Sequence, residues 1–215
     1  MNRHLTLLAL ATGLAILGEA RGAIVYFPGE EIVIPNTYAG VSVDLETGDW
    51  STSLDGLIGG DANFFLGGAR VSNDAYAASV DASWQPVRTG TDNTDAIVQL
   101  PVSTTIDVST ASYSTGFGAS GQIHSHFGGS GFTAGTPGHL GFSLIIDNPA
   151  IPGNPLLVYG WARVTLKDND GVGVLHEWAY ENTGAAIQVG AVPEPRAALL
   201  VGAFGLLALL RRRTC

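Results

Sequence analysis

The chain has 215 residues, of which 46% are hydrophobic and only 13% are charged, and its formal net charge at pH 7 is −9. Binding to phosphate groups needs a basic face, so this balance disfavours nucleic acids and anionic membrane surfaces as partners. The single cysteine excludes an intramolecular disulfide, and a chain of this length can be stabilised by its hydrophobic core without one.

The N-terminus is organised like a secretory signal peptide. A weakly basic region with Arg3 and His4 precedes an uncharged stretch over 5–18, and the small residues Ala20 and Gly22 occupy the −3 and −1 positions of a cleavage site. We expect residues 1–22 to direct export through the general secretory machinery and then to be removed. A retained N-terminal anchor is the alternative, although the uncharged stretch is short for that role.

Between residues 23 and 191 the chain alternates short apolar segments with turn-forming residues. Segments rich in Val, Ile, Tyr, Phe and Trp are separated by clusters of Gly, Asn, Asp and Pro, which is the pattern of strands and turns. The predicted strands are 23–27, 31–34, 40–45, 63–66, 77–84, 97–100, 105–108, 122–127, 139–146, 156–166, 172–181 and 186–189. About a dozen strands at this spacing predict an all-β fold, an antiparallel β-sandwich of which a jelly roll is one form.

The clearest unit is a hairpin between the last two long predicted strands. Its connection, 167–171, is rich in Asn, Asp and Gly, which suit a tight reversal. A register that places Gly160 opposite Trp178 sets small residues across from large ones and puts Arg163 diagonal to Glu177 as an ion pair. A slip of one residue would reverse the faces of the hairpin.

Histidines are the candidate ligands for a metal ion. His124 and His126 are two residues apart and would lie on one face of a strand, with His139 or an acidic side chain completing the site. Against this reading, the chain has no His-Glu-x-x-His motif, and the glycine-rich stretch after Phe127 supplies no further ligand. We therefore assign no cofactor and keep the three histidines as candidates only.

No motif of an enzyme active site is found. The chain lacks a Gly-x-Ser-x-Gly elbow, and Cys215, its one cysteine, lies at the extreme end behind a basic segment. The acidic segments 44–49, 92–95 and 168–171 fall short of a full calcium-binding loop. No catalytic residue is assigned, and the sequence does not support an enzyme.

The last 24 residues combine three features in a fixed order. These are a short motif, Val192, Pro193, Glu194 and Pro195; an apolar run of 14 residues over 197–210; and a basic end, Arg211, Arg212 and Arg213. A membrane-spanning helix needs about 20 residues, so the apolar run is short, but long arginine side chains can reach the interface and hold that end on the cytoplasmic side. We expect a membrane helix here, with a C-terminal helix of a soluble domain as the alternative.

This tail resembles the PEP-CTERM sorting signal of exported bacterial proteins, a tail family also named the ice-binding protein C-terminal domain. The resemblance covers residues 192–215, and a weaker one over 159–190 extends it to the last strands of such proteins. It implies a Gram-negative host, transient anchoring in the inner membrane, and processing at the motif by an exosortase, a membrane enzyme. Delivery to the cell surface or extracellular matrix would follow. The name of the tail does not imply ice binding.

Three functions are open for the domain at 23–191. We first expect an exported surface or matrix protein of structural or adhesive type, with exopolysaccharide as a possible partner. The second is a carbohydrate-binding β-sandwich that stacks sugars on exposed tryptophans. The tryptophans available are Trp50, Trp84, Trp161 and Trp178. The third is a metal-dependent hydrolase built around His124 and His126.

Overall fold

A computed structural model describes residues 23–52, 60–73, 84–90, 95–110, 125–126, 131–167 and 171–193. This described part contains thirteen β-strands and no helix. The strands are β1 Ile24–Phe27, β2 Ile32–Ile34, β3 Val41–Val43, β4 Trp50–Ser51, β5 Ala62–Phe65, β6 Arg70–Asn73, β7 Trp84–Pro86, β8 Thr105–Ile106, β9 Ser125–His126, β10 Pro137–Asp147, β11 Pro155–Thr165, β12 Gly173–Glu181 and β13 Ile187–Gln188. The pairings between them are antiparallel. The prediction of an all-β, antiparallel fold is confirmed.

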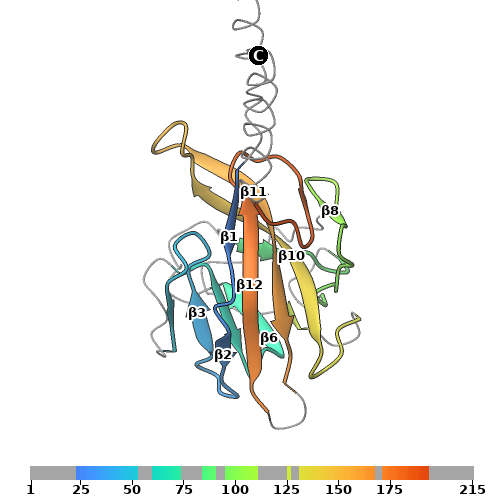
Figure 1. The fold of residues 1–215 in the computed structure, drawn as a ribbon. Helices are drawn as coiled ribbons and strands as arrows, with labels where there is room; N and C mark the ends of the chain where they lie inside the picture. The colour runs from blue at the N-terminus through green and yellow to red at the C-terminus, as the bar shows by residue number, and fades with distance from the viewer. Residues whose placement is uncertain are drawn as a thin grey trace, which may run out of the picture.

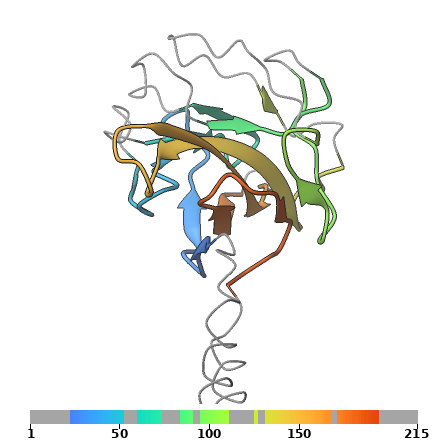
Figure 2. The same ribbon diagram turned by 90° about the horizontal axis from the view of Figure 1, so that it is seen from above.

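Two sheets make up most of this structure (Figure 1). Sheet A has the strand order β1-β12-β11-β10-β7, and β2 also pairs with β12. Because β1 and β2 pair with successive parts of β12, they lie end to end along the same edge. Sheet B has the order β4-β3-β5-β6-β9, and β8 and β13 form a small separate ladder. Figure 2 shows the two long, curved strands β10 and β11, which lie side by side in sheet A.

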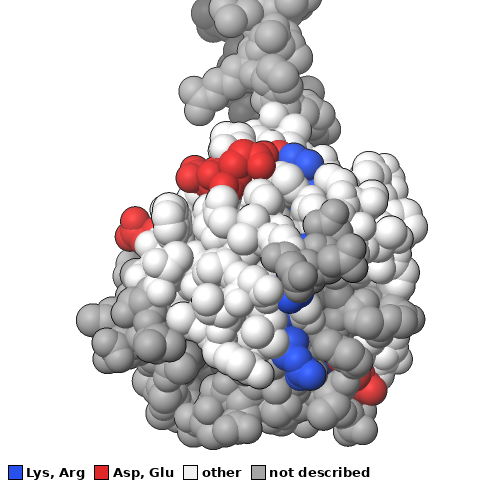
Figure 3. Space-filling model, turned by 90° about the horizontal axis from the view of Figure 1, so that it is seen from below, with Lys and Arg blue, Asp and Glu red and all other residues white. Residues whose placement is uncertain are grey.

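Charged side chains are sparse on the face of the molecule drawn in Figure 3. Acidic side chains gather at one edge of that face, basic side chains lie at a few separate points across it, and most of the rest of the described surface there is uncharged. This fits a chain in which 13% of the residues are charged. The basic side chains on this face form no broad patch of the kind that would attract a polyanion.

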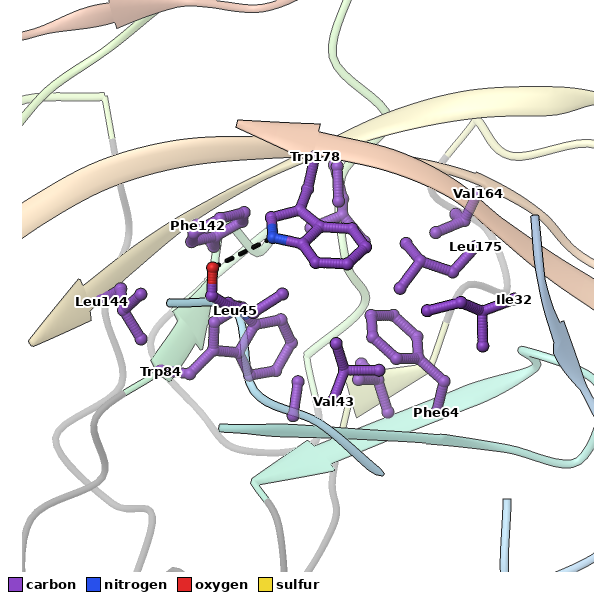
Figure 4. Close-up of a cluster of buried hydrophobic side chains, with 14 of the residues drawn as sticks. Ile32, Val43, Leu45, Phe64, Trp84, Phe142, Leu144, Val164, Leu175 and Trp178 are labelled. Atoms are coloured by element: carbon purple, nitrogen blue, oxygen red, sulfur yellow. Dashed lines mark hydrogen bonds between the residues drawn. The ribbon is translucent and has the colours of Figure 1, made fainter. Parts of the chain in front are cut away.

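The main hydrophobic cluster is built from both sheets (Figure 4). Sheet A contributes Phe142 and Trp178, and sheet B contributes Phe64, all with 1% or less of their surface exposed. The indole Nε1 of Trp178 donates a hydrogen bond to the carbonyl oxygen of Leu45 at 3.0 Å, and its ring stacks on Phe27 with centroids 4.8 Å apart. The buried indole N–H is thus satisfied, which lets a tryptophan occupy the centre of the core.

A second hydrophobic cluster covers the opposite, outer face of sheet A. Its buried members are Val87, Leu100, Ile106, Tyr159, Trp161, Ala179, Ile187 and Val189. The indole Nε1 of Trp161 donates to the carbonyl oxygen of Ala191 at 3.1 Å, which holds the segment after β13 against the sheet. Since both faces of sheet A are covered here, β11 has five consecutive buried residues in place of an alternating pattern.

The hairpin of β11 and β12 differs in register from the prediction. Gly160 pairs with Tyr180, so the expected pairing of Gly160 with Trp178 is wrong. The pair nearest the turn, Thr165 with Val174, is already one residue away from the predicted alignment. A further shift follows because His176 is an extra residue in β12, a β-bulge that turns the side chains on either side of it to different faces.

Candidate functional site

Of the three histidines predicted as metal ligands, two belong to described strands, and these strands are in different sheets. His124 lies outside the described residues, His126 belongs to β9 in sheet B, and His139 belongs to β10 in sheet A. The ring of His139 lies edge-on to Trp161, with centroids 5.6 Å apart. Within the described ranges, no group of three His, Cys, Asp or Glu side chains is placed to hold a metal ion.

The tryptophans are mostly part of the core. All four lie in the described residues, where Trp84, Trp161 and Trp178 expose at most 1% of their surface. Trp50, on the short strand β4, exposes 49%. A stacking platform for sugars needs exposed rings, so Trp50 is the one tryptophan that could supply it.

A group of polar side chains lies on the outer face of sheet A and is named here the polar cluster. Its members are Tyr26, Glu31, Arg163, Thr165, His176 and Glu177. The strand positions explain this placement, since Val164, Leu175 and Trp178 point into the main hydrophobic cluster and their neighbours along the strands point outward. The cluster joins β1, β11, β12 and the residue that precedes β2.

Glu177 lies at the centre of one half of the polar cluster. Its Oε2 accepts a hydrogen bond from the hydroxyl of Tyr26 at 2.5 Å, and its Oε1 accepts one from Nε of Arg163 at 2.6 Å. The ion pair of Arg163 and Glu177 predicted from the sequence is therefore present, with the two residues directly opposite each other.

Hydrogen bonds, burial and charge shift the pKa values of Glu177 and Tyr26 in this half of the polar cluster and of the nearby His139. Burial acts to raise the pKa of Glu177, but the hydrogen bonds from Tyr26 and Arg163 and the nearby positive charges outweigh it, so the pKa lies below its usual range. The hydrogen bond to Glu177, followed by burial, raises the pKa of Tyr26. Burial and the charge of Arg163 lower the pKa of His139. This arrangement holds the carboxylate ionised and the phenol and His139 neutral near pH 7.

The other half of the polar cluster is centred on His176. Its Nε2 lies 2.7 Å from Oγ1 of Thr165, and its Nδ1 lies 2.9 and 3.0 Å from the two carboxylate oxygens of Glu31. The side chain of His176 is 13% exposed, whereas that of Glu31 is 60% exposed. A hydroxyl, an imidazole and a carboxylate thus follow one another at hydrogen-bonding distances. Sequence reasoning missed this group because Glu31 is 145 residues away from His176.

A separate set of acidic groups surrounds Glu46 in the turn after β3. Its desolvation, followed by the negative charges of Asp61, Asp44 and Asp147, raises the pKa of Glu46 from 4.5 to about 7. Asp61 itself is buried and accepts a hydrogen bond from the backbone N–H of Leu45 at 2.8 Å. The burial of Glu46 and the mutual repulsion of these carboxylates are a cost to the folded state.

The raised pKa of Glu46 predicts a pH-dependent stability. A carboxyl group whose pKa is higher in the folded than in the unfolded state stabilises the protein below the unfolded pKa, and that contribution is lost as the pH rises through about 7. Because Glu46 keeps much of its surface exposed, screening reduces the effect to about 1 kcal/mol. We expect Glu46→Gln to be more stable than the unaltered protein by this amount at pH 8 and equally stable at pH 4.

Urea unfolding at the two pH values would measure the difference. Glu30→Gln, which removes one exposed acidic charge outside this group, is the matched control and should change the pH dependence little. An equal gain in both variants would show that the effect follows net charge and not the surroundings of Glu46.

A pocket of about 240 Å³ lies where the two ends of the described domain meet. It is lined by Ile24, Glu181, Ala185, Ala186, Ile187, Gln188 and Ala191. The carboxylate of Glu181 accepts hydrogen bonds from the backbone N–H groups of Thr183 and Ala185 and from the hydroxyl of Thr183. These bonds shape the turn after β12, so the one acidic residue of the pocket has a structural role.

The predicted sorting motif begins next to this pocket. Val192 and Pro193 are described and exposed, and Val192 shows 44% of its surface. Glu194, Pro195, the apolar run and the three arginines, as well as residues 1–22, lie outside the described residues. Within the described ranges no helix has the length and apolar character needed to cross a membrane. No protein-family model, no curated protein and no solved structure matches this chain.

Proposed function

We propose that this chain is an exported bacterial protein of the cell surface or extracellular matrix, with a structural or adhesive role. The general secretory machinery would carry it across the inner membrane, where its C-terminal helix would anchor it until an exosortase cuts at the sorting motif. Residues 23–191 would then be delivered as a β-sandwich of jelly-roll type, with exopolysaccharide as a candidate partner. The shared core of sheets A and B supports the sandwich.

The observation that carries the proposal is the position of the motif relative to the folded domain. The backbone and side chain of Asn182 exchange hydrogen bonds with the backbone of Ala23, at 3.1 and 3.2 Å. The next residue, Ile24, lines the same pocket as Ala191, whose carbonyl oxygen is held by Trp161. The predicted leader and the sorting motif therefore join the domain at adjacent points, as Figure 1 shows for the start of β1 and the end of the described chain.

This geometry supports a tethered surface domain. A domain attached at one end presents its opposite end, where β12 begins (Figure 1), to the surroundings. The burial of three tryptophans, which leaves Trp50 as the one exposed ring among the four, favours a structural or adhesive role over a sugar-stacking site.

Mass spectrometry of both termini, on protein recovered from each cell fraction of its producer, tests the proposal. We expect a mature start near Ala23 and a C-terminus within 193–196, found in the envelope or matrix fraction. Glu194→Ala should leave the tail uncut in the inner membrane, whereas the neighbouring change Arg196→Ala should not. An intact tail ending in Cys215, found only in the inner membrane for the unaltered chain, would contradict the proposal.

A further inference from the structure

We propose that Thr165, His176 and Glu31 form a nucleophilic triad that accepts acyl groups from neutral esters with a short apolar acyl chain. This activity goes beyond the sorting and surface role proposed above and does not depend on it. The proposal rests on the hydrogen-bond geometry of the three side chains, on the backbone that positions them and on the apolar residues beside them.

The order of the hydrogen bonds fixes the role of each side chain. A carboxylate can only accept hydrogen bonds, so Glu31 requires the proton of the neutral imidazole on Nδ1 of His176. The other nitrogen, Nε2, then carries a lone pair and accepts the hydroxyl proton of Thr165 across 2.7 Å. This is the arrangement in which an imidazole acts as a general base on a hydroxyl nucleophile, with the carboxylate orienting the ring.

The backbone is irregular at two of the three positions. His176 is the extra residue of the β-bulge in β12, and a bulge re-aims the side chain that it carries. Glu31 has a φ of +47°, a strained conformation for a residue other than glycine. Both irregularities therefore occur at residues of the triad. The bulge carries the imidazole that lies next to Thr165, and Glu31, which carries the carboxylate, directly precedes β2.

Apolar side chains on the same face suit a short acyl group. Thr165 pairs with Val174, and Val174 pairs with Val33, so the three side chains form a row across β11, β12 and β2. Val33 exposes 53% of its surface, and Val172, just before β12, exposes 52%. The exposed valines beside the hydroxyl offer contact to a few methylene groups, while the acidic side chain of Glu31 would repel an anionic substrate.

The reaction is written with water as the second reactant. The oxygen of Thr165 forms a bond to the carbonyl carbon of the ester as its proton passes to Nε2 of His176. The bond from that carbon to the leaving oxygen then breaks, and the leaving alcohol takes the proton from His176. Water attacks the acyl group on Thr165 in the same manner, which releases the carboxylic acid and restores the hydroxyl.

The test uses the full-length chain and p-nitrophenyl acetate, a neutral ester with a short acyl group. We expect a burst of about one p-nitrophenolate per chain and an acetyl group on Thr165 in the peptide mass spectrum. Thr165→Val and His176→Gln should each lower the burst rate by at least about 100-fold. Thr165→Ser keeps the hydroxyl and should retain the burst, which keeps the test valid if the valine variant does not fold.

The matched control is Thr183→Val, because the hydroxyl of Thr183 bonds the carboxylate of Glu181 with no histidine between them. This variant should react like the unaltered chain. Folding of each variant is checked by circular dichroism. An unacetylated Thr165 in the folded, unaltered chain would overturn the proposal, as would an equal burst in Thr165→Val. Either result would leave the three residues as a structural link between the start of β2 and the hairpin.

Discussion

Replacing Trp178 by alanine is expected to lower the free energy of unfolding by about 3–5 kcal/mol, the usual range for a large buried aromatic side chain. Trp178 has no exposed surface and lies between residues of both sheets. The change removes its stacking on Phe27 and leaves the carbonyl oxygen of Leu45 without its indole donor. Urea unfolding followed by circular dichroism would measure the loss.

The matched control is Trp50→Ala. Trp50 exposes 49% of its surface and lies on β4, at the edge of sheet B, so its removal opens a smaller gap. We expect a loss below about 1 kcal/mol, as for most exposed positions. Equal losses in the two variants would contradict the assignment of Trp178 to the centre of the core.

The long strands could be predicted from the sequence because their residues carry a strong local signal. The segments predicted at 139–146, 156–166 and 172–181 appear as β10, β11 and β12, each with only small changes at its ends. They are rich in β-branched and aromatic residues and are bounded by turn-forming residues, which is the signal that local reasoning can detect.

Short strands carry no such signal. Trp50–Ser51 and Arg70–Asn73 were not predicted, yet they form β4 and β6 through pairing with β3 and β5. The second of these contains one apolar residue, Val71, in four. Their strand character comes from pairing with neighbouring strands and not from their own residues, so contacts outside each segment decide it and not local propensity.

The segment 97–100 shows the opposite error, since it was predicted as a strand and forms only an isolated bridge between Arg88 and Ile97. Its apolar residues are nevertheless used. Ile97 belongs to the main hydrophobic cluster and Leu100 to the outer one, so the segment passes from one cluster to the other along the edge of sheet A. Hydrophobicity correctly predicted burial here, but it did not predict the strand.

The polar cluster could be predicted only in part. Arg163 and Glu177 were expected to interact because the predicted register placed them diagonally across one hairpin, and such local pairs follow from the strand period. The link from His176 to Glu31 and Thr165 depends on a bulge that no glycine or proline marks in the sequence. A one-residue insertion in a strand changes which side chains share a face, so this half of the cluster required the structure.

Replacing Gly160 by alanine is expected to cost about 2–3 kcal/mol of unfolding free energy, the upper part of the range for overpacked cores. A Cβ atom at this position would lie 2.4 Å from Cζ of Phe142 and 2.6 Å from the carbonyl oxygen of Ala179. The ring of Phe142 is itself fully buried, so it can move aside only by displacing other core residues. Thermal unfolding followed by circular dichroism, converted to free energies with urea titrations, would measure the cost.

A double-mutant cycle separates this clash from a general sensitivity of β11 to substitution. Phe142→Leu shortens the side chain that the new methyl group meets, so Gly160→Ala should cost less in that background, with a coupling of about 1 kcal/mol. The destabilisation by Gly160→Ala should be only partly relieved in this background. The new Cβ atom also meets the carbonyl oxygen of Ala179, which Phe142→Leu leaves in place. Strict additivity of the two changes would show that the methyl group does not meet Phe142 and would contradict the close packing of β11 against β10 at this position.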